Sequence, residues 1–381
     1  MTPAPTIAEA RSAILRPEEI APAAWDDLFR RAASPHPFYS RHVIAAHRSA
    51  GLLPSDLRVL TVSSGKRLDA LLPFGLRRDL SALGGLVARP FLSPYITATA
   101  PLIVADAGRA TLAALADGLL AASGGRAWRW PLLSSESVAG SALLAALRSA
   151  GWSHAAAMSF ERPVLDRRES FDAFLAGHPH RARFKDLRRR LRRLGETGRV
   201  AVESAEEGSR LAALVETFLL LEKESWKGAA GTALACRTET ATFARTLFRD
   251  TGGPVSARAD ALTLDGRPIA ISLALVGAGT ATLLKTTYDE TLRSQAPGLL
   301  LEAEIARLCH ETGFADRLDS ATLPGSPLES LYRDRETVAE IIAVPPGADA
   351  LTLERRLRLA RFERRGREAA RRILPSARRK T

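Results

Sequence analysis

The stretch LLKTTYDETLRSQAPGLLLEAEIARLCHETGF (residues 283–314) changes character in its middle. It begins as an apolar, strand-like run, turns polar between Asp289 and Gly298, and then resumes with apolar residues at helical spacing. The free N–H groups and the dipole at a helix N-terminus attract anions, so a junction of this kind is a common place for an anion or a cofactor. We therefore expect a strand, a ligand-binding loop and a helix here.

The segments around this junction predict an α+β unit with mostly antiparallel strands. Residues 257–289 read as consecutive strands, with turns at Asp265-Gly266 and at Gly277–Gly279, where glycine accepts positive φ at low cost. The other elements expected are strands at 199–205, 315–323 and 337–346, and helices at 206–226, 238–252 and 326–335. This order is not a regular βαβ alternation, and neither GxGxxG after a strand nor GxxxxGK[ST] occurs, which argues against nucleotide-binding folds.

The length of 381 residues favours two domains over one core. We expect an N-terminal α/β lobe over residues 1–165, a second domain over residues 166–345, and a basic helix or tail over residues 346–381. The N-terminus does not resemble a signal peptide, and no apolar run approaches the roughly 20 residues of a membrane span. Cys236 and Cys309 match no metal or redox spacing, as expected for free thiols in a reducing cytoplasm.

The net charge of +12 is concentrated in two segments. Residues 181–199 hold 9 basic and 2 acidic residues, and residues 354–381 hold 12 basic and 3 acidic residues. The rest of the chain is slightly acidic, so the protein is not a uniformly basic nucleic-acid binder.

Four blocks, in this order and spacing, resemble a known family: RRRLRRLGETGRVAV, FLLLEKESWKGAAGTAL, LTLDGRPIAISLAL and LLKTTYDETLRSQAPGLLLEAEI. They are similar to GNAT acyltransferases of the cellulose-biosynthesis (CelD/BcsL-type) branch over about residues 165–345. That branch is related to the Fem-type aminoacyl-tRNA-dependent transferases, which carry two GNAT-like halves. The resemblance implies two GNAT-like lobes, each a mixed, mostly antiparallel sheet flanked by helices.

The polar loop is the expected binding site for the pyrophosphate of an acyl-CoA co-substrate. Gly298 would allow the backbone to approach a phosphate, and Pro297 suits a first helical turn because it has no N–H to leave unsatisfied. Arg293 could supply charge where the usual family loop has more glycine and often an arginine. A plain helix-capping turn remains the structural alternative. The cofactor-binding residues expected are Arg293, Ser294, Gln295, Ala296, Pro297, Gly298 and Leu299.

Two residues of the preceding strand are the expected catalytic pair. Lys285 interrupts an apolar run, and a buried lysine is costly unless it is paired or functional. Tyr288 is the general-acid candidate that the resemblance implies, since a phenol can protonate a leaving thiolate. Alternation along a strand places Lys285 and Tyr288 on opposite faces unless a bulge intervenes, and Tyr288 could equally be an edge-strand tyrosine.

Three further residues are expected near the acceptor. The resemblance places Trp226 and Lys227 in a loop beside the acceptor cleft, with packing as the alternative role for each. Asp319 lies near the carboxyl end of an expected strand, a position where ligand-binding residues often occur.

The seven histidines show no metal-binding spacing, so no metal is expected. Glu222 and Glu224 are possible amine bases, although most glutamates on such a helix are solvated.

The two basic helices each have two interpretations. The helix at 181–194 carries a narrow apolar stripe, which fits an interdomain helix with a solvated arginine face or an anion track. The C-terminal helix could touch acidic membrane headgroups, with Leu357, Leu359 and Phe362 giving shallow burial, or it could be a disordered tail.

We expect a cytoplasmic N-acyltransferase that moves an acyl group, preferably acetyl, from acyl-CoA to an amine in polysaccharide, cell-envelope or lipid biosynthesis, with possible attachment to the inner face of the membrane. The alternatives are a Fem-like transferase using aminoacyl-tRNA, or a non-catalytic binding module of the same fold. Nucleic acid is otherwise not expected as a partner.

Overall fold

The computed structural model describes residues 9–249 and 252–373. The chain divides into two compact units, one of residues up to 41, 54–160 and 337 onward (unit 1), the other of residues 42–53 and 161–336 (unit 2). Two strands, β7 (Ser153–Asp166) and β13 (Asp334–Val344), contribute residues to both units.

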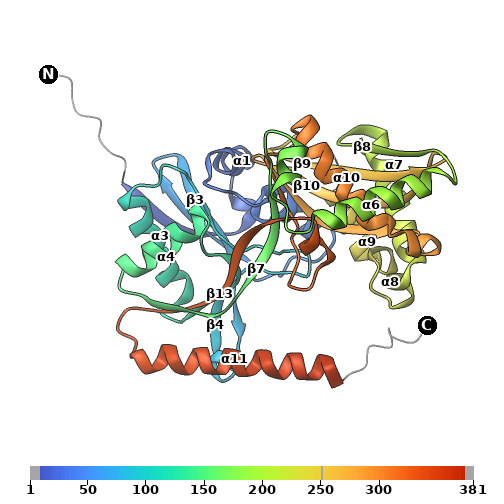
Figure 1. The fold of residues 1–381 in the computed structure, drawn as a ribbon. Coiled ribbons are helices and arrows are strands. Elements are labelled where there is room, and N and C mark those ends of the chain that lie inside the picture. Colours follow the sequence, from blue (N-terminus) through green and yellow to red (C-terminus); the bar gives the residue numbers. More distant parts are fainter. Residues whose placement is uncertain (1–8, 250–251, 374–381) are drawn as a thin grey trace. The chain divides into compact units, whose positions relative to one another are not determined.

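Unit 1 contains a sheet with the strand order β1-β2-β3-β4-β6-β13, and β5 also pairs with β3. Helix α3 packs against β1 and β2. The elements of unit 1 before β7 are β1 (Ala10–Leu15), η1 (Pro17–Glu19), α1 (Pro22–Arg31), η2 (Pro37–Tyr39), β2 (Arg58–Ser64), β3 (Arg67–Arg78), η3 (Leu80–Ala82), β4 (Leu86–Pro90), β5 (Leu102–Ile103), α3 (Arg109–Ser123), β6 (Trp128–Ser134) and α4 (Val138–Ser149); α11 (Ala350–Ile373) follows β13. Helix α2 (Arg41–Ser49) lies between η2 and β2 in the chain and belongs to unit 2 from His42 onward. Figure 1 shows α11 as a long helix beside β4.

Unit 2 contains a sheet with the order β12-β11-β10-β9-β8, and the end of β7 pairs with β12. The pairs are antiparallel except β11 with β12. The elements are α5 (Phe171–Ala176), α6 (Arg181–Gly195), β8 (Val200–Ala205), α7 (Gly208–Glu224), α8 (Trp226–Ala229), η4 (Leu234–Cys236), α9 (Thr238–Leu247), β9 (Val255–Leu264), β10 (Arg267–Gly277), β11 (Thr280–Tyr288), η5 (Glu290–Gln295), α10 (Pro297–Thr312), β12 (Arg317–Asp319) and η6 (Pro327–Ser330).

Helices cover both faces of the unit 2 sheet. Helices α7 and α10 both pack on β9, β10 and β11 (Figure 1). Strand β10 is therefore buried on both sides, which explains why its sequence is almost continuously apolar instead of alternating. The expected fold class, a mixed sheet of mostly antiparallel strands flanked by helices, is confirmed.

Local differences from the expected elements have identifiable causes. The hairpin at Asp265-Gly266 is present, with both residues at positive φ. The expected strand 315–323 is paired only over Arg317–Asp319, since the residues after Asp319 form no ladder with β11 or β7. The expected helix 326–335 is reduced to the four-residue η6, and Asp334 and Arg335 begin β13 instead.

Helix α11 is folded over its described length, so the disordered-tail interpretation does not hold there. Leu357 packs with Ala157, Ile342 and Ala360 in a small core. The expectation that Leu357 is available for shallow membrane burial is therefore wrong, because the side chain is already buried within unit 1. Residues 374–381 of the expected basic tail lie outside the described residues.

Candidate active site

Strand β11 separates from its parallel neighbour shortly after it begins. It pairs with β12 only through Thr280–Thr282 and then continues to Tyr288. On its other side, β11 pairs with β10, and the register shifts so that Leu273 opposes Lys285 while Ala274 opposes Leu283. Leu284 is thus a β-bulge, a feature that increases local twist and often marks a functional site. The bulge and the separation lie together, which leaves the later part of β11 with an edge that β12 does not pair.

Side chains beyond the bulge reach opposite faces of the sheet. The Lys285 Nζ atom lies 2.7 Å from Glu222 Oε1 on α7. The Thr286 hydroxyl donates a hydrogen bond of 2.6 Å to Glu302 Oε1 on α10. Tyr288 shares the α10 face, because a Cβ built on Gly298 would lie 3.2 Å from Tyr288 Cδ1. The structure therefore does not bring the two expected catalytic side chains, Lys285 and Tyr288, onto one face.

Glu222, Lys227 and Lys285 form what we call the lysine–glutamate cluster. The Glu222 side chain is fully buried and its Oε2 atom accepts a hydrogen bond of 2.7 Å from the Leu234 N–H. Its Oε1 atom is shared by Lys285 and by Lys227, whose Nζ atom lies 3.4 Å away. Glu222 is thus saturated with donors and positions the two ammonium groups. The cluster has two cations for one carboxylate, which favours an anion nearby.

Lys227 also contacts the edge of β11 that β12 leaves unpaired. Its Nζ atom donates a hydrogen bond of 3.0 Å to the Thr286 carbonyl oxygen. The N–H and C=O groups of one strand residue point the same way, so the Thr286 N–H faces this edge as well. Burial lowers the pKa of Lys227, the nearby Lys285 cation lowers it further, and the Glu222 carboxylate opposes both. Lys227 can therefore exchange a proton more readily than an exposed lysine.

The expected anion-binding loop forms η5 and the first turn of α10. Asp289 caps η5 by accepting from the Thr291 N–H at 3.0 Å, as expected for a capping role. Pro297 is the first residue of α10, as its missing N–H predicts. The first helical bond after it runs from the Leu300 N–H to the Ala296 carbonyl oxygen at 3.0 Å. The N–H groups of Gly298 and Leu299 precede this bond and belong to the unpaired set that favours anions.

Two residues of this loop have structural roles that the sequence did not indicate. Gly298 packs beside the Tyr288 ring: a Cβ at this position would lie 3.2 Å from Tyr288 Cδ1, so a side chain there would have to displace the ring by a few tenths of an ångström. Ala296 caps α10 with φ +57°, a left-handed conformation that is costly for a residue with a Cβ. The side chains of Arg293 and Ser294 are exposed, and Gln295 ends η5.

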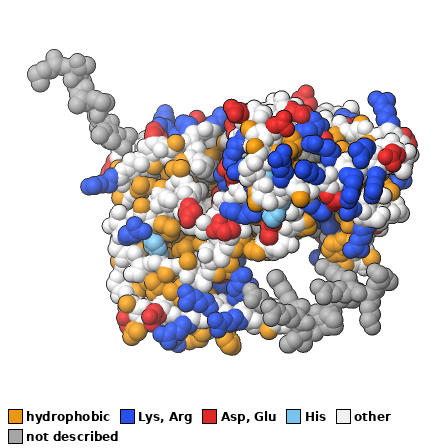
Figure 2. All heavy atoms as spheres, in the orientation of Figure 1, with side chains coloured by type: hydrophobic (Ala, Val, Ile, Leu, Met, Phe, Trp, Pro, Cys, Tyr) orange, Lys and Arg blue, Asp and Glu red, His pale blue; other side chains and the backbone are white. Residues whose placement is uncertain are grey.

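Helix α6 brings more positive charge to this loop. Arg190 donates a hydrogen bond of 2.8 Å to the Ser294 carbonyl oxygen, and it is also paired with Asp186. Figure 2 shows basic side chains gathered over α6. A surface pocket of about 290 Å³ between α5 and α6 is lined by Asp172, Leu175, Ala176, Arg181, Phe184, Lys185 and Arg188. The apolar stripe of α6 is also present, since Phe184, Leu187 and Leu194 are buried. The helix packs within unit 2, against α10, β8 and η5.

Glu302 lies in the core on the α10 side of the sheet. Burial raises its pKa from 4.5 to about 7, against hydrogen bonds from Thr286 and Ser272 that lower it. Its Oε2 atom is buried without a hydrogen-bond partner among the described residues. A protonated carboxyl group fits this position better than a carboxylate.

The remaining expected residues lie on α7, α8 and β12. Trp226 begins α8 and is 48% exposed, whereas Glu224 is exposed and Glu222 is buried. Asp319 is the residue of β12 opposite Thr282, at the point where the two strands separate. It accepts a hydrogen bond of 2.8 Å from the Ala321 N–H and lies 3.7 Å from Arg162. Within the described residues, no group of three or more histidine, cysteine, aspartate or glutamate side chains could hold a metal ion.

Comparisons with known proteins bear on the fold. A family model described as an acetyltransferase (GNAT) domain matches residues 181–322, the segment that carries the cluster, the bulge and the loop. No curated protein matches the sequence.

Solved structures resemble the chain over most of its length at low identity. The C-terminal domain (DUF2156) of an Agrobacterium fabrum protein described as a lysylphosphatidylglycerol synthetase has 16% identity and a TM-score of 0.54, covering 86% of this chain and 92% of that one. FemX has 11% identity and a TM-score of 0.54, covering 87% and 96%. L-PGS from Bacillus licheniformis has 13% identity and a TM-score of 0.50, covering 89% and 96%. Residues 181–322 of unit 2 thus match a GNAT acetyltransferase domain, and the chain shares its fold with these solved structures.

Proposed function

We propose that this protein is a GNAT-type N-acyltransferase that transfers an acyl group from acyl-CoA to an amine. The observation that carries this proposal is the separation of β11 from β12 beside the bulge at Leu284. It leaves a strand edge with the Thr286 N–H, next to the ammonium groups of Lys227 and Lys285. An acyl carbonyl lying in this gap would meet a backbone donor and positive charge as its oxygen becomes negative.

The proposed reaction uses each member of the cluster differently. The amine nitrogen attacks the thioester carbonyl, and the oxyanion is held by the Thr286 N–H with Lys285 beside it. Lys227 first loses its ammonium proton to solvent, which its lowered pKa favours, and its neutral amine then takes the proton from the attacking amine, while Lys285 remains the cation beside the oxyanion. The C–S bond then breaks and the thiolate receives a proton. Tyr288 remains the candidate donor for this proton; burial raises the pKa of its phenol, so it stays protonated at neutral pH.

The donor's diphosphate is proposed to bind at the first turn of α10. The N–H groups of Gly298 and Leu299 supply donors, and Arg190 and Arg293 supply charge on the same loop. In this arrangement the diphosphate lies beyond the end of β11, and the reactive end of the donor lies along its free edge.

One observation favours a second donor, an aminoacyl-tRNA. Arg181, Lys185 and Arg188 lie along one face of α6 and line a shared pocket, in an element already bonded to the loop through Arg190. A row of cations on one face suits a nucleic-acid backbone better than a single diphosphate. The Fem-type resemblance implies the same donor.

The proposed acceptor is an amine in polysaccharide, cell-envelope or lipid biosynthesis, as the cellulose-biosynthesis-type resemblance implies. Trp226 and Asp319 are proposed to lie beside it.

Calorimetric titration with acetyl-CoA and a long-chain acyl-CoA tests the donor, using Gly298→Asp and Gly298→Asn. The two side chains are almost equal in size and meet the same Tyr288 contact, so they differ mainly in charge. Gly298→Asp should weaken acyl-CoA binding at least tenfold more than Gly298→Asn, because a carboxylate repels a diphosphate at this helix end.

Equal effects of the two variants on acyl-CoA binding would contradict binding of the diphosphate at this helix end. Absence of acyl-CoA binding, together with tight binding of a charged tRNA that high salt weakens, would replace acyl-CoA with aminoacyl-tRNA as the donor.

A further inference from the structure

Helix α11 has one face fixed against unit 1. Leu357 and Ala360 are buried against Ile342 and Ala157, and Leu353 packs at the margin of this small core. The Arg361 guanidinium donates a hydrogen bond of 3.1 Å to the Ala157 carbonyl oxygen. This face is apolar and occupied, so it cannot serve a second partner without leaving unit 1.

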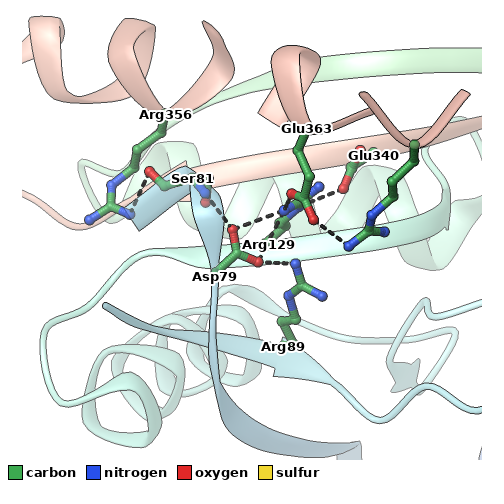
Figure 3. A network of polar contacts seen from close by, with 8 residues as sticks. Asp79, Ser81, Arg89, Arg129, Glu340, Arg356 and Glu363 are labelled. Atoms are coloured by element: carbon green, nitrogen blue, oxygen red, sulfur yellow. Dashed lines mark hydrogen bonds and ion pairs between the residues drawn. The ribbon is translucent and has the colours of Figure 1, made fainter. Parts of the chain in front are cut away.

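A polar network, shown in Figure 3, fixes the rotation of the helix. Arg129 on β6 lies 2.6 Å from Glu340, 2.7 Å from Glu363 on α11 and 2.9 Å from Asp79. Arg89 also pairs with Asp79, and Arg356 of α11 bonds to the Ser81 carbonyl oxygen at 3.5 Å. Because these groups are buried or half-buried and carry opposite charges, the helix cannot turn about its axis without breaking them.

The opposite face of α11 carries arginines and large apolar side chains together. Leu351, Arg355, Arg358, Phe362 and Arg365 are exposed and follow each other at intervals of three or four residues. Leu351 is 67% exposed and Phe362 is 74% exposed, the highest value among the exposed large apolar side chains described. Basic and hydrophobic side chains appear side by side along the helix in Figure 2.

The tip of the β3–β4 hairpin, which contacts α11, also exposes apolar side chains. The tip includes η3, which packs against α11 and supplies the Ser81 carbonyl that binds Arg356. Leu80 is 55% exposed and Leu83 is 63% exposed, and Leu86 at the start of β4 is exposed as well. Arg78 is exposed at the same tip. Two elements in contact thus present leucine, phenylalanine and arginine to solvent.

We infer that the outward face of α11 and the tip of the β3–β4 hairpin dock unit 1 onto an anionic lipid bilayer. The arginines complement acidic headgroups, and the exposed leucine and phenylalanine side chains would enter the boundary of the acyl chains. A polyanion alone would leave these apolar side chains in water, whereas a bilayer surface accommodates both kinds of group. Among the described residues, no helix is long and apolar enough to cross a membrane. The inference concerns a surface contact and is independent of the proposed reaction.

The test is sedimentation of the full chain with vesicles of phosphatidylcholine, with and without 30% phosphatidylglycerol (roughly the acidic content at which such helices bind). The chain should bind only the acidic vesicles, and 0.5 M NaCl, at which the Debye length is about 4 Å, should release most of it. Arg355→Gln/Arg365→Gln should lower the partition coefficient about thirty-fold and Phe362→Ser about tenfold.

The matched controls are Arg109→Gln/Arg148→Gln, which removes the same charge from exposed sites, and Val138→Ser, which changes an exposed apolar residue elsewhere in unit 1. Both should bind like the unaltered chain.

Equal binding to both vesicle types, no binding to acidic vesicles, or equal losses in the control variants would overturn the inference. A competition with a single-stranded RNA of about 20 nucleotides, which is longer than typical binding sites of about 4–16 nucleotides, adds one further outcome. RNA binding that depends on Arg355 and Arg365 but not on Phe362 would assign this face to nucleic acid and also overturn it.

Discussion

At the scale of single residues, the site depends on charged side chains placed where a helix or strand should be apolar. Glu222 falls on the stripe of α7 that buries Leu211, Leu214, Val215, Phe218 and Leu219. Glu302 falls likewise among the buried residues of α10. Their helical spacing could have identified both, because an acidic residue in an apolar stripe needs a partner or an altered pKa. Lys285 was found by this reasoning on its strand, and its partner on α7 was not.

Glu222→Gln should lower the free energy of unfolding by about 2 kcal/mol, because Lys285 and Lys227 would lose their shared carboxylate. Glu224→Gln, an exposed change on the same helix, should have almost no effect. Urea denaturation of both variants at pH 7 measures this. Equal stability of the two variants would mean that the cluster contributes no net stability.

Glu302 should make stability depend on pH. Its pKa is raised from 4.5 to about 7 in the folded chain, so the folded state holds an extra proton between these values. The stability from this group is fully present below pH 4.5 and is lost as the pH rises through about 7. Relative to Glu302→Gln, which does not titrate, the unaltered chain should therefore lose up to about 3 kcal/mol across this range.

Urea denaturation between pH 5 and pH 8 (roughly spanning the transition) gives this difference for each protein. Glu304→Gln on the same helix is the control, since Glu304 is paired with Arg307 near the surface. A difference between the unaltered chain and Glu302→Gln that does not change with pH would show that Glu302 is ionised throughout.

At the scale of elements, the junction of β11, η5 and α10 combines favourable and costly choices. Pro297 begins α10 as the position requires, whereas Ala296 before it adopts positive φ. Tyr288 and Gly298 are complementary, since the ring of one fills the place of a side chain on the other. Residues 283–314 therefore predicted a strand, a loop and a helix from their sequence, but not the bulge that turns Lys285 toward α7.

Ala296→Gly should raise the free energy of unfolding by about 1 kcal/mol, because glycine adopts the left-handed conformation without steric cost. Ala303→Gly, in the middle of the same helix, should lower it by about 1 kcal/mol. Thermal denaturation of the pair distinguishes local backbone strain from a general effect on α10. A loss of stability in Ala296→Gly would indicate that the Ala296 methyl group makes contacts worth more than the strain.

At the scale of the whole molecule, each unit is organised around a different kind of buried polar group. Unit 1 holds a balanced network in which Arg129 joins Asp79, Glu340 and Glu363, and α11 is fixed by it (Figure 3). Unit 2 holds the lysine–glutamate cluster beside a strand edge that β12 leaves unpaired. The first network pairs each of its carboxylates with an arginine, whereas the second places two lysines around one carboxylate beside a strand edge.

Arg129→Met should destabilise unit 1 by about 3 kcal/mol or more, because it leaves buried carboxylates without their shared cation. Hydrogen exchange followed by mass spectrometry should show faster exchange in β4, β6 and α11 and little change in α7 and β11. Arg109→Met, at an exposed position, should leave exchange unchanged. Exchange that increases equally in both units would mean that the network has no local role.

The sequence by itself determined the elements around the junction, the mostly antiparallel fold class and the start of α10 at Pro297. These follow from periodicity, turn chemistry and helix-start signals, which act over a few neighbouring residues. Only the tertiary structure decided that Glu222 joins Lys227 and Lys285, that the bulge at Leu284 turns Lys285 toward α7, and that Leu357 is buried while Phe362 is exposed. Each of these depends on contacts between segments distant in the chain, or on one extra residue in a strand, and local sequence does not specify which face a side chain will meet.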